Sequence, residues 1–298
     1  MMDNTTYVKE IEFFEHVRNM LNKPFHQFNL EFHPNIKKGE VRNYIANVRN
    51  MHLMISEDKL IFRNSLCKFY HGYNHKNLSV TQLNQAVTDL ENILGISLRD
   101  ASVRSFEYGI VLPVGNPKEC YQNWHLYKGR SPQVMSASGR EYGVSYENST
   151  HKLKCYDKTF EAKRNGFYFD RNLIRVEKRV TPSHLNSSPR FKDNKILTLG
   201  DLCSWKVQEL LGEDLIISLR KIELKNLPNG YDELSTKDLR IWGYMQFEPI
   251  RKAMHKSHPE AFKVDRAKYN KILQDYRKYN QDVFIEEVAY VIKECINN

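Results

Sequence analysis

Three short strings contain the residue types needed for chemistry on a phosphate group. "CYDKTFE" carries Tyr156, Lys158 and Glu161, "IRVEKRV" alternates basic and acidic residues, and "VRSFEYG" contains Glu107. A tyrosine can attack phosphorus, carboxylates bind hard divalent cations, and basic side chains neutralise charge that develops in a transition state. Together these types could perform tyrosine-dependent phosphoryl transfer.

Each string has the alternation of a β-strand, in which every second side chain points to the same face. If the strands are neighbours, one face collects Glu107, Lys154, Tyr156, Lys158, Arg175, Glu177 and Arg179. A free phenol, with a pKa of about 10, is a weak nucleophile at neutral pH, and nearby cations favour its phenolate. Glu107 and Glu177 would bind Mg²⁺ or Mn²⁺, with open positions left for a phosphate.

A purely structural interpretation accounts for the same pattern. Glutamate and arginine alternating on an exposed sheet face form ordinary cross-strand ion pairs. The chain has 17 tyrosines, and a tyrosine is more often a packing residue than a nucleophile. Periodicity alone therefore leaves both interpretations open.

The elements that position these strings belong to an α+β fold. Residues 79–95 predict a helix with a capping box at Ser79 and Gln82 and a stop at Gly95. Strands are predicted over 58–72, 101–113, 152–163 and 172–180, and residues 182–195 predict a loop or linker. From about residue 198 the period becomes helical. We therefore expect a central, mostly antiparallel sheet with flanking helices, followed by a helical C-terminal region.

Four strings occur in the order found in a known family. The run Ser65 to Asn74 fits an S-x-x-K-x-x-x-G-x-N pattern, and "VRSFEYG", "CYDKTFE" and "IRVEKRV" follow it. This series resembles the gene-two nicking-closing endonucleases of filamentous phages. The second and third strands also resemble the replication initiators of staphylococcal rolling-circle plasmids. The resemblance spans about residues 60–180.

The resemblance implies a metal-dependent initiator of rolling-circle DNA replication, which nicks and rejoins one strand at an origin. Tyr156 would form a 5′-phosphotyrosyl ester and leave a 3′ hydroxyl as primer. The resemblance assigns the phosphate-facing cations Lys158, Arg175 and Arg179 and the metal carboxylates Glu107 and Glu177, with Glu161 as an accessory carboxylate. Lys68 and Asn74 would contact DNA or order the site, and Lys154, Lys163 and Arg164 would add DNA-binding charge.

Two positions depart from the family pattern. Glu107 stands where the family has aspartate, and Val111 stands where the plasmid relatives have a further acid. The site would therefore hold its metal with fewer carboxylates.

The net charge of +9 is concentrated, because residues 152–192 contain eleven bases and four acids. Such a segment favours a polyanionic partner, here single-stranded and duplex origin DNA. A host helicase and a second copy of the chain, in a homodimer, are further partners consistent with this role. Five cysteines without a CxxC pair, no export signal and no apolar run that could span a membrane predict a protein of a reducing bacterial cytoplasm.

The predicted organisation is a nicking-joining domain over 1–195 and a helical region over 196–298 that either binds DNA or packs on the sheet. In the latter region Tyr269, Ile272, Leu273 and Tyr276 are expected to pack inward, although the bases around them could also contact duplex DNA. His71 and His75 lie four apart in a turn-forming stretch, which favours structural or DNA-contacting roles over metal binding. No pair of histidines is separated by a single apolar residue, so the HUH type of nicking enzyme is excluded.

Two other functions remain open. A mobilisation relaxase of the same fold would nick a transfer origin, and a non-catalytic origin-binding initiator would use the basic charge without Tyr156. Two winged-helix modules would favour the binding protein, and the strand-rich centre of the chain argues against them.

Overall fold

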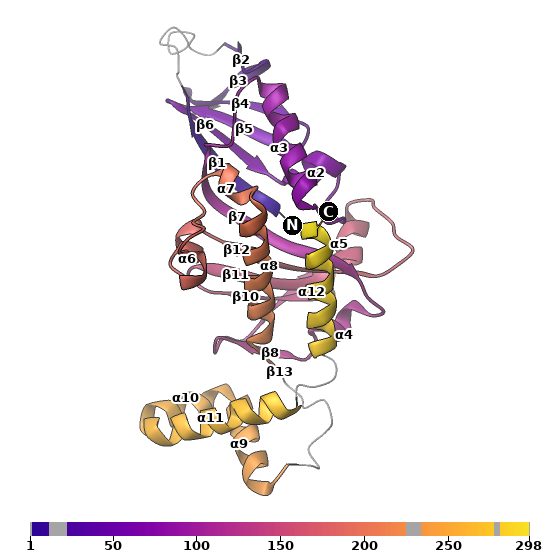
Figure 1. The fold of residues 1–298 in the computed structure, drawn as a ribbon, viewed down its shortest axis with the longest axis vertical. Coiled ribbons are helices and arrows are strands. Elements are labelled where there is room, and N and C mark those ends of the chain that lie inside the picture. Colours follow the sequence, from indigo (N-terminus) through magenta and orange to yellow (C-terminus); the bar gives the residue numbers. More distant parts are fainter. Residues whose placement is uncertain (1, 12–22, 225–233, 277–280, 298) are drawn as a thin grey trace.

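The computed structural model describes residues 2–11, 23–224, 234–276 and 281–297. Within them, eleven strands form one sheet in the order β2-β3-β4-β5-β6-β1-β7-β12-β11-β10-β9 (Figure 1). All of the strand pairings in this sheet are antiparallel. The predicted α+β class is confirmed, with helices beside the sheet and a helical C-terminal region.

The first half of the sheet comes from six strands, and the sequence patterns predicted only the last of them, as the first part of the strand expected over 58–72. They are β1 (Met2–Glu10), β2 (Phe25–Gln27), β3 (Leu30–Lys37), β4 (Glu40–Val48), β5 (Met51–Ser56) and β6 (Lys59–Asn64). Two-residue connections join the strands from β2 to β6, and Lys38 and Gly39 both have positive φ angles, as a two-residue hairpin turn requires. Short hairpins therefore build this end of the sheet.

Two helices follow β6. The strand predicted over 58–72 is wrong in its second half, because Ser65 accepts a hydrogen bond from the Lys68 amide and begins α2 (Leu66–His71). The predicted helix is confirmed as α3 (Val80–Leu94), including its capping box and the left-handed Gly95. The chain then enters the sheet again as β7 (Ser102–Pro113).

The second half of the sheet consists of β9 (Gln133–Ala137), β10 (Arg140–Glu147), β11 (His151–Asp157) and β12 (Leu173–Val180). Helix α4 (Pro117–Tyr121) and strand β8 (Trp124–Tyr127) precede them, and α5 (Lys158–Arg164) separates β11 from β12. The loop predicted over 182–195 instead contains α6 (Pro182–Asn186) and a 3₁₀ turn (Pro189–Phe191), because Leu185 and Phe191 are buried in the core.

The C-terminal region divides between two cores. Helices α7 (Leu199–Leu202), α8 (Trp205–Arg220) and α12 (Gln281–Asn297) join the core of the sheet, whereas β13 (Ile222–Leu224) pairs with β8. Helices α9 (Thr236–Gln246), α10 (Glu248–Ser257) and α11 (Pro259–Tyr276) surround a small core of their own. Tyr269 and Ile272 are buried there as predicted, whereas the side chains of Leu273 and Tyr276 lie outside the described part.

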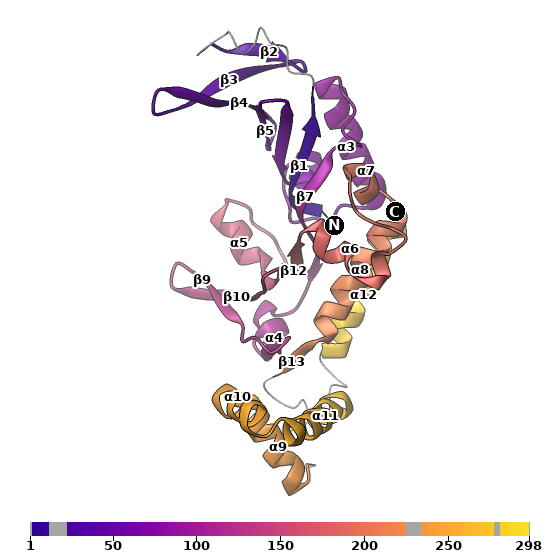
Figure 2. The same cartoon turned by 90° about the vertical axis from the view of Figure 1, so that its left-hand side faces the viewer.

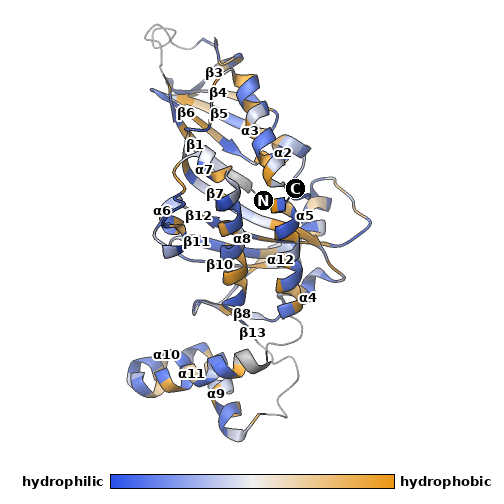
Figure 3. Ribbon diagram, viewed as in Figure 1, coloured by the Kyte–Doolittle hydropathy of each residue, from blue (hydrophilic) through white to orange (hydrophobic). Residues whose placement is uncertain are grey.

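Helices cover one face of the sheet and leave the other open. In Figure 2, α3, α8 and α12 lie on one side, and α5 and the β3-β4 hairpin project to the other. Hydrophilic residues predominate in α10 and α11, with hydrophobic positions among them (Figure 3). None of the helices in the described ranges is long and apolar enough to cross a membrane.

A buried polar contact attaches α8 to the sheet. The Lys178 ammonium donates to Asp214 Oδ2 at 2.5 Å and to Ser218 Oγ at 3.0 Å, and the Tyr108 hydroxyl also donates to Asp214. Burial opposes ionisation of Asp214, but the neighbouring Lys178 outweighs it and keeps the pKa of this carboxyl below its usual value. Asp214 therefore remains a carboxylate at neutral pH.

We predict that Asp214→Ala lowers the free energy of unfolding by about 3–5 kcal/mol, because it leaves the buried Lys178 charge without a carboxylate to neutralise it. Urea unfolding at neutral pH measures the change. Glu209→Ala, which removes an exposed ion pair with Lys206 on the same helix, is the control and should cause no measurable loss. Equal losses in the two variants would contradict a stabilising role for the buried pair.

Candidate active site

The register of four strands arranges the predicted residues in three rows on the open face of the sheet. One row is Glu107, Arg179, Lys152 and Glu147; the next is Gly109, Glu177, Lys154 and Ser145; the third is Val111, Arg175, Tyr156 and Gly143. The prediction that these strands are neighbours and share a polar face is confirmed. Lys158 was expected on the same face but lies in a helix instead.

Lys154 connects the two carboxylates. Its ammonium donates to Glu107 Oε1 at 3.1 Å and to Glu177 Oε1 at 2.7 Å. Both glutamates are buried, with 4% and 3% of their surface exposed, so each needs a positive partner. Burial alone would lower the pKa of Lys154, but the two glutamates reverse this effect and raise it, so that the amine stays charged.

Arg175 links the carboxylates to the tyrosine row. Its Nε donates to Glu177 Oε2 at 2.5 Å, and its Nη1 donates to the backbone oxygen of Asn74 at 2.9 Å. Tyr156 is its direct cross-strand neighbour and is only 7% exposed. The Tyr142 ring meets the Tyr156 ring edge-on, with centroids 6.2 Å apart. Tyr156 therefore lies beside a guanidinium that is held in place by two partners.

Lys158 and Glu161 do not extend the strand, which corrects the prediction. The Asp157 carboxylate accepts a hydrogen bond from the Phe160 amide at 2.8 Å and begins α5 at Lys158. Arg140 supports this cap through a contact of 2.8 Å with Asp157. Lys158 is consequently almost fully buried and donates to Glu161 at 2.5 Å and to Asn74 Oδ1 at 2.9 Å.

The segment from Ser65 to Asn77 orders this end of the site. Ser65 caps α2, and Gly72 ends it with a φ of 82°. Asn74 accepts from both Lys158 and Arg175, and the Asn77 side chain pairs with both backbone groups of Val111. The segment therefore covers β7 beyond its pairing with β1, and Asn74 orders the basic side chains of the site.

The remaining predicted residues lie around this network. Arg179 is exposed on β12 in register with Glu107, and Lys163 and Arg164 are exposed at the end of α5. Lys68 lines a small cleft between α2 and α5. Their positions suit contacts with a bound polyanion, and their roles stay predictions.

Two glycines that the sequence patterns did not single out set the spacing of the strands. A Cβ at Gly109 would lie 2.2 Å from Val176 O and 2.6 Å from Glu177 Cα. At Gly143 it would lie 2.4 Å from Tyr156 Cβ. The lack of a side chain lets β7 and β10 approach the strands that carry Glu177 and Tyr156.

Glu107 and Glu177 could hold a divalent cation in the place that the Lys154 ammonium now takes. The Lys154 ammonium shows that both Oε1 atoms reach a single cation, and Mg²⁺ commonly binds through one or two carboxylates, substrate phosphates and water. The described residues contain no group of three or more His, Cys, Asp or Glu side chains that could hold a metal ion. Glu107 and Glu177 can accept Mg²⁺ or Mn²⁺ only if the Lys154 ammonium leaves its place.

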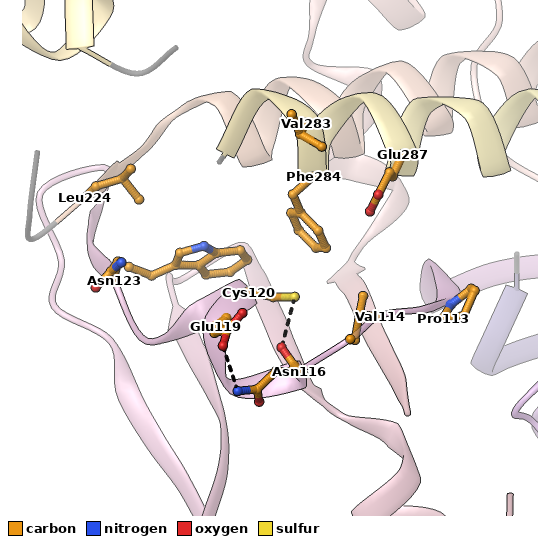
Figure 4. A pocket seen from close by; sticks show the side chains of 12 residues that line it. Pro113, Val114, Asn116, Glu119, Cys120, Asn123, Leu224, Val283, Phe284 and Glu287 are labelled. Atoms are coloured by element: carbon orange, nitrogen blue, oxygen red, sulfur yellow. Dashed lines mark hydrogen bonds between the residues drawn. The ribbon is translucent and has the colours of Figure 1, made fainter. Parts of the chain in front are cut away.

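A cavity of about 540 Å³ between α4 and α12 lies apart from these residues (Figure 4). Its Cys120 thiol has a pKa raised to about 12, first by burial and then by Glu287 and Glu119. The thiol is therefore a poor nucleophile, and the two acids disfavour a phosphate. The chemistry expected from the sequence belongs to the sheet face.

No protein-family model and no curated protein matches the chain. Among solved structures, it is similar to the rolling circle replication initiator protein from Geobacillus stearothermophilus, with 10% sequence identity and a TM-score of 0.37. The match covers 74% of this chain and 84% of that one.

We predict that Gly109→Ala lowers the free energy of unfolding by about 1–3 kcal/mol, because the added methyl group forces β7 away from β12. Gly115→Ala is the control, since a Cβ there meets no described atom within 4 Å and the backbone is not left-handed. Urea unfolding compares the two. If both variants match the parent, the close approach of the strands does not constrain the site.

Proposed function

We propose that this protein nicks and rejoins one strand of DNA at a replication origin of the rolling-circle type, with Tyr156 as nucleophile. The observation that carries the proposal is the meeting of Tyr156, Arg175 and the Lys154-bridged carboxylates on the open face of one sheet. Buried charged clusters of this kind are costly to stability and are typical of functional sites.

In the proposed reaction the Tyr156 Oη attacks a backbone phosphorus. A bond forms between this oxygen and phosphorus, the bond from phosphorus to the 3′ oxygen breaks, and the phenol proton is transferred to the departing 3′ hydroxyl. Arg175 would neutralise the phosphate, since its guanidinium lies in the row of Tyr156. Attack by the 3′ hydroxyl on the phosphotyrosyl ester reverses the step and rejoins the strand.

The surrounding residues have supporting roles in this proposal. Lys158 and Glu161 position Asn74, and through it Arg175, whereas Arg179 adds charge at the exposed edge. A Mg²⁺ or Mn²⁺ ion held by Glu107 and Glu177 would supply further neutralisation of the phosphate. The DNA partners are single-stranded and duplex origin DNA. A helicase partner, a homodimer and the mobilisation variant stay predictions.

We predict that Tyr156→Phe abolishes the covalent attachment of protein to single-stranded origin DNA in the presence of Mg²⁺ or Mn²⁺, because the attacking oxygen is gone. Denaturing gels with end-labelled DNA detect the adduct. Tyr142→Phe tests the neighbouring phenol, and Tyr290→Phe, which alters an exposed ring on α12, is the control that keeps full attachment.

An adduct that survives in Tyr156→Phe would overturn the assignment, and its loss only in Tyr142→Phe would transfer the role to that residue. DNA binding without nicking under either metal would favour the non-catalytic initiator.

We predict that Lys154→Met increases the affinity for Mn²⁺ at least tenfold, about 1.4 kcal/mol, in protein without DNA. The ammonium competes with the metal for the same two oxygens, and methionine removes that competition. Electron paramagnetic resonance of free Mn²⁺ measures binding without any dependence on nicking. Lys152→Met is the control, because Lys152 pairs with the exposed Glu147. Unchanged affinity in Lys154→Met would argue against Glu107 and Glu177 as the metal pair.

A further inference from the structure

Four aromatic rings form a cluster where the turn after α2 meets the loop after α5. The Tyr73 and His75 rings are stacked, with centroids 3.8 Å apart and an interplanar angle of 3°. Phe169 meets His75 edge-on at 4.3 Å, and Phe167 lies 5.4 Å from His75 and 6.3 Å from Tyr73. We call these four residues the aromatic cluster. Figure 1 shows α5 and the loop that follows it beside α2.

One ring of the cluster is exposed to solvent, and Tyr73, His75 and Phe169 are half-buried. Phe167 is 42% exposed, and the adjacent Tyr168 is 78% exposed. Tyr73, His75 and Phe167 line a cleft of about 100 Å³, to which Lys68, Asn74 and Glu161 also contribute. Exposed aromatic rings around a cleft are typical of binding surfaces, because their burial by a ligand is favourable.

The charge around the cluster fits a nucleic acid. Lys163, Arg164 and Arg171 are exposed on α5 and its following loop, and the Lys76 ammonium lies 5.6 Å from the centre of the Tyr73 ring. His75 itself is uncharged at neutral pH, since burial, followed by the charges of Lys158 and Lys76, lowers its pKa. The cluster thus offers neutral ring faces within a cationic border, which matches a base and its phosphates.

Asn74 connects the cluster to the proposed nucleophile. This residue lies between Tyr73 and His75, and its backbone oxygen accepts from Arg175, the cross-strand neighbour of Tyr156. Its side chain accepts from Lys158 at the start of α5. A ligand on the cluster would therefore lie beside the phosphate that Arg175 binds.

We propose that Tyr73, His75 and Phe167 form a stacking subsite for one unstacked base of single-stranded DNA, next to the cleaved phosphate. Lys163 and Arg164 contact the adjoining backbone. This inference rests on the proposed function, which it deepens by giving the strand a path across the site. A duplex cannot use the subsite, since its bases are already stacked on one another.

The test measures affinity alone, in the Tyr156→Phe background, by fluorescence anisotropy of a labelled oligo-dT strand and of a duplex. Phe167→Ala and Tyr73→Ala should each weaken binding of the single strand by about 5- to 150-fold and leave duplex binding unchanged. Phe167→Trp should retain the affinity, and Phe167→Leu, which keeps an apolar group without the ring, should lose it. Tyr290→Ala removes an exposed ring far along the chain and should change neither affinity.

Abasic positions in the oligonucleotide identify the contact. A strand lacking the stacked base should bind the Tyr156→Phe parent more weakly, and Phe167→Ala should then cause no further loss. Equal weakening of single strand and duplex, or a changed dependence on salt, would assign Phe167 to backbone binding and overturn the subsite. Unchanged single-strand affinity in both alanine variants would overturn it as well. Because binding is measured without nicking, these results can refute the stacking subsite while Tyr156-dependent nicking still holds. In the same way, the subsite can be supported in a protein that does not nick DNA.

Discussion

The interaction on which the site depends is the bridge from Lys154 to Glu107 and Glu177. The three residues come from β11, β7 and β12, so the bridge forms only when these strands have the correct register. A slip of one residue would exchange the two faces of a strand and direct buried carboxylates towards the helices. The same charges that serve the proposed chemistry therefore specify the pairing of the strands that carry them.

Strand β12 has to satisfy polar groups on both faces. Arg175 and Glu177 point to the open face, and Lys178 points to α8, where Asp214 receives it. All three side chains are buried, and each is paired. On the helix-covered face, Lys178 and Asp214 form a buried ion pair with two hydroxyl partners, whereas the open face holds a network of alternating charges. In the proposed reaction, the open face would exchange some of these internal partners for a phosphate and a cation.

The alternation of side chains was sufficient to predict which residues share the open face, because a strand has a period of two whatever its neighbours are. It failed where a side chain caps a helix. Asp157 and Ser65 each turn a β-rich string into strand and helix through one hydrogen bond to the backbone, and alternation contains no signal for that. The role of Gly109 and Gly143 could not be predicted for another reason, since it depends on their close contact with strands that are distant in sequence. The Lys38-Gly39 turn, by contrast, is a local signal: Gly39 marks a two-residue hairpin turn that the alternation of side chains alone does not predict.

The switch from strand to helix after Tyr156 has a consequence for how the site is built. If β11 continued through Lys158, that ammonium would lie on the open face beside Tyr156. Instead, α5 buries Lys158 against Asn74 and leads the chain into the loop with Phe167 and Phe169. The cap at Asp157 thus starts the helix that connects two surfaces, the charged face of the sheet and the aromatic cluster. In the proposed function, a strand of DNA that meets both would be held by stacking on one side and by charge on the other, with Arg175 and Asn74 between them.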